Sequence, residues 1–197
     1  CQIKNKNIQG INVTVPFKNV IIPYLDLLSP EANATQSVNT VYLNGDKVVG
    51  HNTDIAGFEL SLKKIKYDVN NKKVLILGSG GVVPSIIFAL YKMKVSLITV
   101  CNRTRKKAEN LKKRFKDIII TDWGNISNFD LIINATSVGL HKDDKINLDF
   151  SQIDKNKLFY DVIYNPEETD FLRKGKQLGN ITENGKMMFI FIDLREV

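Results

Sequence analysis

The chain has 197 residues, of which 43% are hydrophobic and 25% are charged, as in an average globular domain. No apolar run approaches the roughly 20 residues that span a bilayer, and the first ten residues are too polar and basic for a signal peptide. This composition predicts one large domain or two small ones, without a membrane partner.

The positive charge raises the question of nucleic acid. The formal net charge is +7 and the isoelectric point is about 9.3. The lysines are spread along the chain, however, and aromatic residues do not alternate with them as in a stacking surface for nucleic acid. We therefore expect a small anionic ligand and no nucleic-acid partner.

Cysteine and histidine are too few and too scattered for a zinc site or a disulfide framework. The only ones are Cys1, Cys101, His51 and His141, so no metal is predicted. A reducing, cytoplasmic setting is the simple interpretation. A nucleophilic Cys/His pair is an alternative that no local motif supports.

The first part of the chain contains short alternating segments. Residues 11–15 alternate apolar and polar side chains, which predicts a strand, and a helix is expected over residues 19–28. Residues 29–36 are typical of a short helix or turn. Asn44-Gly45 is a strong turn signal and predicts a hairpin over residues 37–54.

A helix is predicted to begin at Thr53 or Asp54, because Phe58, Leu62 and Ile65 recur at intervals of three to four. From Lys73 onward the pattern changes to short continuous apolar runs. Five such runs occupy residues 73–78, 95–102, 117–122, 129–135 and 157–165.

Continuous apolar strands that alternate with helices indicate a parallel sheet covered on both faces. Helices are predicted near residues 82–92 and 104–116, between the first three strands. The expected fold class is therefore α/β, with a smaller α/β unit in front. The boundary is placed near residues 66–72, which gives units of residues 1–66 and 67–180 and a C-terminal segment of residues 181–197.

Glycines follow the first of these strands directly. Gly78, Gly80 and Gly81 precede a predicted helix, where glycine lets the backbone approach a pyrophosphate at the helix N-terminus. Val83 stands where the dinucleotide-binding pattern has its third glycine, which weakens the match. The strand–turn–helix context favours a dinucleotide site. An ordinary tight turn is the alternative.

The next strand ends in a basic segment. Asn102, Arg103, Thr104 and Arg105 occupy the region where an NAD-preferring enzyme usually has an acidic residue, and no carboxylate occurs before Glu109. Arginine pairs with phosphate, so the pattern favours the 2′-phosphate of NADP. The alternative is a solvated basic helix start. Residues 133–140, which follow the fourth strand, fit either a ligand-binding loop or a plain turn.

Three polar residues of the front unit follow strand-like segments. Lys18, Asn39 and Asp54 would meet at one rim if these strands share a sheet. A lysine held by a carboxylate is a plausible proton donor to a carbonyl that becomes an alcohol. From this chemistry alone, a solvated Lys18 and a helix-capping Asp54 are the favoured alternative.

The chain also resembles a known family. The segments INVTVPFK, SVNT, GHNTD, GSGG, NRT, INATSVGL, YDVIYNPEET and ENGKM occur in the order found in the shikimate dehydrogenase family, which includes quinate-using relatives. The resemblance covers nearly the whole chain. It implies a Rossmann-like NADP-binding domain, a substrate domain truncated at its N-terminus, and NADPH-dependent reduction of 3-dehydroshikimate to shikimate on the route to chorismate and the aromatic amino acids.

The resemblance also implies site residues. It makes Lys18 the catalytic proton donor and Asp54 its partner. Substrate contacts are implied for Thr14, Asn39, Asp54 and Tyr164. Cofactor contacts are implied for Gly78, Ser79, Gly80, Gly81 and Val82 at the pyrophosphate, for Asn102, Arg103, Thr104, Arg105, Lys106 and Lys107 at the adenosine end, and for Val162 and Gly185 at the nicotinamide.

The chain departs from the family pattern in three places: at its beginning, at position 192, and at its end, where it stops at Val197 short of the closing helix that returns to the first domain in relatives. The match begins partway into the substrate domain, so the serine-containing loop that binds the shikimate carboxylate in relatives is missing, and we expect the chain to be part of a longer protein. Ile192 stands where relatives have a substrate-binding glutamine. An NAD-using quinate/shikimate dehydrogenase and a non-catalytic NADP-binding module are therefore the alternatives. Monomer and homodimer are both compatible with the sequence.

Overall fold

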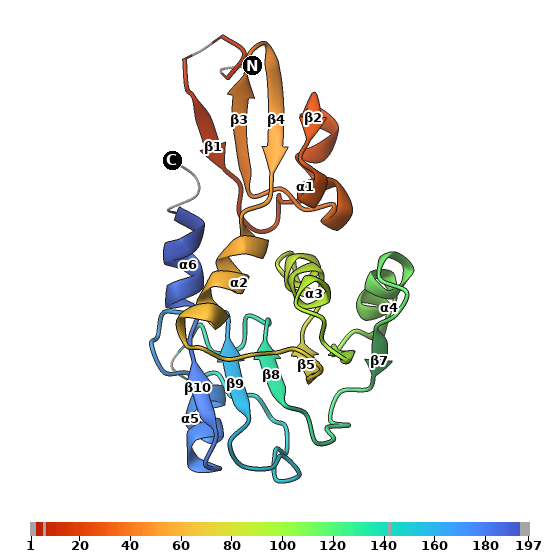
Figure 1. Ribbon diagram of the computed structural model, residues 1–197, viewed down its shortest axis with the longest axis vertical. Coiled ribbons are helices and arrows are strands. Elements are labelled where there is room, and N and C mark those ends of the chain that lie inside the picture. The colour runs from red at the N-terminus through yellow and green to blue at the C-terminus, as the bar shows by residue number, and fades with distance from the viewer. Residues whose placement is uncertain (1–2, 6, 142, 194–197) are drawn as a thin grey trace.

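The computed structural model describes residues 3–5, 7–141 and 143–193. Cys1, one of the two cysteines, lies outside this range. The described residues form two sheets: a four-stranded sheet of order β1-β3-β4-β2 and a six-stranded sheet of order β10-β9-β8-β5-β6-β7. The two sheets lie at opposite ends of the molecule, with α2 and α3 between them (Figure 1).

The four-stranded sheet is built around the predicted hairpin, which is confirmed. β3 (Thr40–Asn44) pairs antiparallel with β4 (Lys47–His51). The turn between them contains Gly45 with φ of 62°, a conformation that glycine adopts without steric cost. β1 (Gly10–Asn12) pairs with β3, and the short β2 (Leu27–Leu28) pairs parallel with β4.

Two predictions in this region are wrong. The first strand ends at Asn12 instead of residue 15, although the Val13 N–H still donates to the carbonyl of Asn39. The helix expected over residues 19–28 is only a 3₁₀ turn, η1 (Ile22–Tyr24), followed by β2. Pro23 explains the difference, because proline lacks the N–H that would extend a helix through it.

Two helices follow the predicted positions. α1 (Pro30–Thr35) is capped by Ser29, whose hydroxyl accepts from the N–H of Ala32 at 3.1 Å. α2 (Asp54–Lys64) begins where the periodicity placed it, and Phe58 and Leu62 are buried on its inner face. The chain then crosses to the six-stranded sheet.

The six-stranded sheet is entirely parallel, as predicted. Five of its strands correspond to the five apolar runs: β5 (Lys73–Leu77), β6 (Leu97–Cys101), β7 (Ile119–Thr121), β8 (Leu131–Asn134) and β9 (Leu158–Asp161). The helices α3 (Val83–Lys92) and α4 (Arg105–Arg114) connect β5 to β6 and β6 to β7. The strand order reverses between β5 and β8, and ligands of such sheets bind at the carboxyl ends of the strands at this point.

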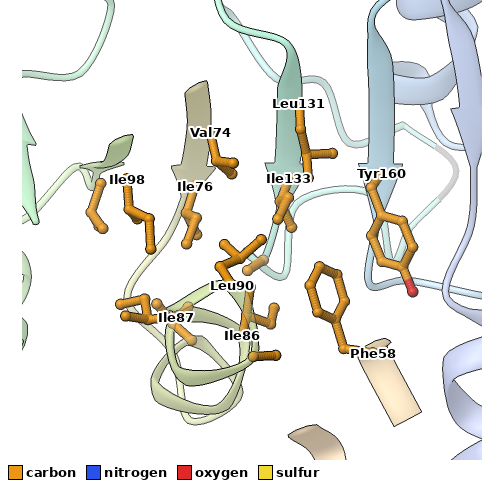
Figure 2. Close-up of a cluster of buried hydrophobic side chains, with 14 of the residues drawn as sticks. Phe58, Val74, Ile76, Ile86, Ile87, Leu90, Ile98, Leu131, Ile133 and Tyr160 are labelled. Atoms are coloured by element: carbon orange, nitrogen blue, oxygen red, sulfur yellow. The ribbon is translucent and has the colours of Figure 1, made fainter. Parts of the chain in front are cut away.

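Alternate residues of these strands face two separate cores. Val74 and Ile76 of β5 contact α3 and α2 on one face, together with Ile133 and Tyr160 (Figure 2). Leu75 and Leu77 face the other side, where α5 (Asp170–Gln177) and the long segments around β8 cover the sheet. Burial on both faces explains why the strands are continuously apolar.

The sequence did not predict the last three elements, which are α5, β10 (Ile181–Glu183) and α6 (Lys186–Asp193). β10 extends the parallel sheet beside β9. α6 packs against α2 (Figure 1), closely enough that a Cβ on Gly57 would lie 2.6 Å from the side chain of Ile192. Among the described residues, no helix is long and apolar enough to cross a membrane.

Candidate active site

The Lys18 ammonium and the Asp54 carboxylate form an ion pair at the junction of the two sheets. Lys18 Nζ lies 2.6 Å from Asp54 Oδ2, and the two side chains are 13% and 3% exposed. Lys18 follows β1 by six residues, whereas Asp54 is the first residue of α2. Asp54 therefore does more than begin a helix, because its carboxylate is engaged by the lysine.

Asn39 holds the other oxygen of this carboxylate. Its Nδ2 donates to Asp54 Oδ1 at 3.2 Å and to Thr53 Oγ1 at 2.7 Å, and its Oδ1 accepts from the N–H of Thr53 at 2.9 Å. Asn39, Thr53 and Asp54 are each at most 4% exposed. The structure thus brings Lys18, Asn39 and Asp54 together, with both carboxylate oxygens occupied.

The segment that carries Lys18 also reaches the second sheet. Its backbone is fixed by the N–H of Val38, which donates to the Lys18 carbonyl at 2.7 Å. A Cβ placed on Gly81 would lie 3.9 Å from both the Lys18 and Val15 side chains. The ion pair therefore stands next to the glycine loop that follows β5.

A cleft of about 800 Å³ opens at the carboxyl ends of β5, β6, β8 and β9. This volume is within the range of about 300–1,000 Å³ that ligand pockets usually have. Its walls come from both parts of the chain and contain no carboxylate. The lining residues are Thr14, Val15, Gly78, Ser79, Gly80, Gly81, Val82, Asn102, Arg103, Thr104, Lys107, Trp123, Ala135, Thr136, Ser137, Leu140, Val162, Ile163, Tyr164 and Asn165.

The glycine loop leaves room for a pyrophosphate. Gly78 packs against β8, since a Cβ there would lie 2.8 Å from the Ala135 carbonyl oxygen, and its φ is +108°. In front of Gly80 and Gly81 the space is open, with the nearest atoms 3.7 and 3.9 Å from an added Cβ. α3 begins two residues later, so the positive end of its dipole lies next to this space. These features fit a dinucleotide.

The basic residues after β6 divide into two groups. Arg103 and Lys107 line the cleft with Asn102 and Thr104, which fits a phosphate on the adenosine ribose. Arg105 turns away from the cleft and pairs with Asp122 and with Glu109, the latter at 3.1 Å. Lys106, like Arg105, is not among the residues that line the cleft. Only part of the predicted basic set therefore faces the cofactor cleft.

The far end of the cleft is formed after β9. Val162 and Tyr164 both line it. The Tyr164 ring stacks on Phe189 of α6, with centroids 4.7 Å apart and an interplanar angle of 23°. Gly185 lies behind Val162, with its Cα directly against the Val162 carbonyl, so that no side chain fits there. Gly185 supports this wall without lining the cleft.

A buried carboxylate organises the two loops at this end. Asp161 is 0% exposed and accepts from Thr169 Oγ1 at 2.6 Å, from the Ile163 N–H at 3.0 Å and from Asn134 Nδ2 at 3.1 Å. Burial raises the pKa of Asp161 to about 6, against these hydrogen bonds, which favour the charged form. Asn134 in turn accepts from the hydroxyl of Thr136 at 2.7 Å.

Thr136 and Ser137 line the cleft, which sequence reasoning left undecided. The sequence feature that could have identified them is their position directly after β8, the neighbour of β5 at the point where the strand order reverses. Trp123 was missed, because a single aromatic after β7 forms no pattern. Ile192 lies against Gly57 of α2, packed at the margin of the core.

Comparisons with known proteins agree with this geometry. The model of the shikimate dehydrogenase substrate binding domain matches residues 1–41, and that of shikimate/quinate 5-dehydrogenase matches residues 59–167. A shikimate dehydrogenase (NADP(+)) from Pelagibacter ubique is 57% identical over 189 residues, which is 96% of this chain and 71% of the relative.

Solved structures give the same result. Shikimate dehydrogenase from Aquifex aeolicus is 34% identical with a TM-score of 0.87, over 98% of this chain and 72% of that one. The enzyme from Thermus thermophilus, in complex with NADP(H) and shikimate, is 30% identical with a TM-score of 0.87, over 97% and 73%. By sequence, fold and cleft, the chain belongs to the shikimate dehydrogenase family.

Proposed function

We propose that the chain reduces 3-dehydroshikimate to shikimate with NADPH, with Lys18 as the proton donor. The NADP-dependent shikimate dehydrogenase activity follows from the family, and the direction of reduction and the residue roles are the proposal. The observation that carries it is the Lys18–Asp54 pair, 2.6 Å apart and adjacent to the glycine loop of a cleft that fits a dinucleotide.

The chemistry requires a hydride and a proton at one carbonyl group. NADPH supplies the hydride when it is bound. We assign to the Lys18 ammonium the donation of the proton to the ketone oxygen and the stabilisation of the negative charge that develops there. Asp54 fixes the lysine through Oδ2, and Asn39 fixes Asp54 through Oδ1. These successive contacts hold the Lys18 ammonium in one position, and such a fixed proton donor favours the transition state.

The remaining residues divide between the two ligands. We assign Thr14, Asn39 and Tyr164 to the substrate together with Asp54. The residues from Gly78 to Val82 would hold the pyrophosphate, and Asn102, Arg103, Thr104 and Lys107 would hold the 2′-phosphate and adenosine. Val162 would contact the nicotinamide. Arg105 and Lys106 contribute only positive charge near the site, since neither faces the cleft.

The domain division follows the two sheets. We propose a substrate domain of residues 1–66, an NADP-binding domain of residues 67–180, and a C-terminal segment of residues 181–197 that begins with the last strand of the parallel sheet and continues into α6 beside α2. A cytoplasmic location, a monomer or homodimer, and the lack of a nucleic-acid partner remain predictions from the sequence.

The test follows the formation of NADPH over time by the absorbance band of its reduced nicotinamide ring. The chain is mixed with shikimate and NADP, and the assay is repeated with quinate and with NAD. We expect reduction of NADP that depends on shikimate, with slower turnover of quinate and of NAD. Turnover with NAD alone would instead support a quinate/shikimate dehydrogenase that uses NAD.

The second candidate function is a non-catalytic NADP-binding module. Ile192 favours it, because an isoleucine that packs on α2 offers no hydrogen bond to a substrate. Thermal protection by NADPH without protection by shikimate, and without turnover, would establish this alternative.

A further inference from the structure

A buried polar cluster near the Lys18–Asp54 pair joins the substrate-binding half of the molecule, residues 1–66, to the NADP-binding half, residues 67–180. The cluster consists of Thr35, Ser37, Asn52 and Ser85, which are 0%, 2%, 2% and 0% exposed. Three of these residues belong to the part of the chain that carries the ion pair. Ser85 is on α3, the helix that follows the glycine loop.

Asn52 is the centre of this cluster. The two hydrogens of its Nδ2 are shared among three acceptors: the Ser37 carbonyl at 2.8 Å, Ser85 Oγ at 2.9 Å and Thr35 Oγ1 at 3.1 Å. Its Oδ1 accepts from the Ser85 hydroxyl at 3.3 Å. The amide therefore bonds to both halves at once, with no charged group involved.

A second contact reaches the glycine loop itself. The Ser37 hydroxyl donates to the Gly81 carbonyl at 3.2 Å. On the outer side, Arg114 at the end of α4 donates to the Thr35 carbonyl at 2.6 Å. The segment of Thr35 to Ser37 is thus bonded directly to α4 and to the glycine loop of the NADP-binding half, and through Asn52 to α3.

The same two short segments hold the proton donor. Val38, next to Ser37, donates its N–H to the Lys18 carbonyl at 2.7 Å, and Asn39 donates its amide to Asp54. On the other segment, Asn52 is two residues from Asp54. Each segment therefore contacts the NADP-binding half at one end and the ion pair two residues later.

We propose that Asn52 and Ser85 are positioning residues, which fix the Lys18–Asp54 pair at a set distance from the glycine loop and hence from the nicotinamide. Hydride and proton must reach one carbonyl group from different halves of the molecule. A displacement of about 1 Å between the halves is enough to lower the rate about 100-fold. A buried, fully bonded amide resists that displacement better than apolar packing alone, since sliding would leave polar atoms unpaired.

The test compares two serine-to-alanine variants of the full chain. Ser85→Ala removes the hydroxyl that Asn52 contacts. Ser61→Ala is the matched control, because Ser61 is equally buried and its hydroxyl also joins the two halves, through a hydrogen bond of 2.8 Å between α2 and Tyr160 of β9, but at a place seven residues along α2 from Asp54. Ser61 also donates to the Phe58 carbonyl at 2.8 Å, so this variant removes a buried hydroxyl and a contact between the halves without touching the segments that hold the ion pair. Both variants are expected to show a similar fall in the urea midpoint.

The inference rests on the proposed activity for its kinetic arm. In Ser85→Ala we expect kcat to fall 10- to 100-fold while the Kd of NADPH, measured by its fluorescence, changes less than about 2-fold. Ser61→Ala should keep kcat within about 2-fold of the wild type. Equal kcat in the two variants, or a loss in Ser85→Ala explained by weaker NADPH binding, would overturn the inference. An inactive wild type would count against the proposed function instead.

A structural arm does not depend on turnover. Amide hydrogen exchange at Val38 and Thr53, which donate to Lys18 and Asn39, should become faster in Ser85→Ala and stay unchanged in Ser61→Ala. Unchanged exchange in both variants would contradict a positioning role whatever the activity.

Discussion

The buried carboxylate of Asp161 makes a quantitative prediction about pH and stability. Its pKa is raised from the ordinary value of 3.8 to about 6 by burial. One pKa unit corresponds to about 1.4 kcal/mol, so the ionised group opposes folding by about 3 kcal/mol at a pH well above 6. Replacement by asparagine removes the charge at nearly constant volume.

The sign follows from proton binding. The folded chain holds the Asp161 proton more tightly than the unfolded chain, so this group's contribution to stability is present at low pH and is lost as the pH rises through 6. Between about pH 5 and about pH 8 the change is about 1.4 kcal/mol, because titration is incomplete at the lower value. The free energy of unfolding of the wild type, relative to Asp161→Asn, should therefore fall by this amount over that interval.

The assay is urea unfolding followed by the fluorescence of Trp123, the only tryptophan, which packs beside the core that α5 covers. Asp149→Asn serves as a control of opposite sign. The Ser151 N–H donates to Asp149 and lowers the pKa of its carboxyl, so acid should weaken the wild type relative to that variant. The reasoning would be refuted if the free energy of unfolding of the wild type, relative to that of Asp161→Asn, stayed constant or rose as the pH increased.

Two further predictions concern the cofactor cleft. Gly78→Ala should lower the free energy of unfolding by about 2 kcal/mol or more, because φ of +108° and the Ala135 carbonyl both oppose a side chain. Gly80→Ala should instead weaken NADP binding at nearly unchanged stability, because the space in front of Gly80 is open. Urea unfolding and NADPH fluorescence titration distinguish the two effects, and equal stability losses in both variants would contradict the assignment. Arg103→Ala should raise the Kd of NADPH about 10-fold or more and leave the Kd of NADH nearly unchanged. Arg105→Ala, which breaks surface ion pairs with Asp122 and Glu109, should change neither Kd strongly. Isothermal titration measures both constants, and a larger loss of NADPH affinity in Arg105→Ala than in Arg103→Ala would contradict the assignment.

The cofactor-binding half was the more predictable part of the fold. Its central strands β5, β6, β8 and β9 are buried on both faces, so each reads as an unbroken apolar run, and Gly78 marks the turn at the switch point. α5 and β10 were missed because they are short and mix polar and apolar residues, and α6 was missed because its unbroken apolar run, residues 187–192, has no helical period; tertiary packing on β9 and α2 determines them.

The front half was less predictable for a different reason. Apolar residues before and after Pro23 have helical spacing, but the proline limits the helix to one 3₁₀ turn. The site shows the same limit. Spacing alone placed Lys18, Asn39 and Asp54 after separate strands, while their contacts depend on the hairpin register that aligns Thr40 with His51. The Asn52–Ser85 contact joins residues 33 apart in the chain, and no local pattern indicates it.

The central claim is that Lys18 donates the proton. The direct measurement is shikimate-dependent NADP reduction by Lys18→Ala, with Lys63→Ala as the control, since Lys63 is an exposed lysine at the end of α2. We predict that kcat of Lys18→Ala falls by a factor on the order of 100 to 10,000, while its Kd for NADPH stays within about 2-fold of the wild type and Lys63→Ala remains fully active. Turnover by Lys18→Ala within about 3-fold of the wild type would contradict the account, because another group would then have to supply the proton.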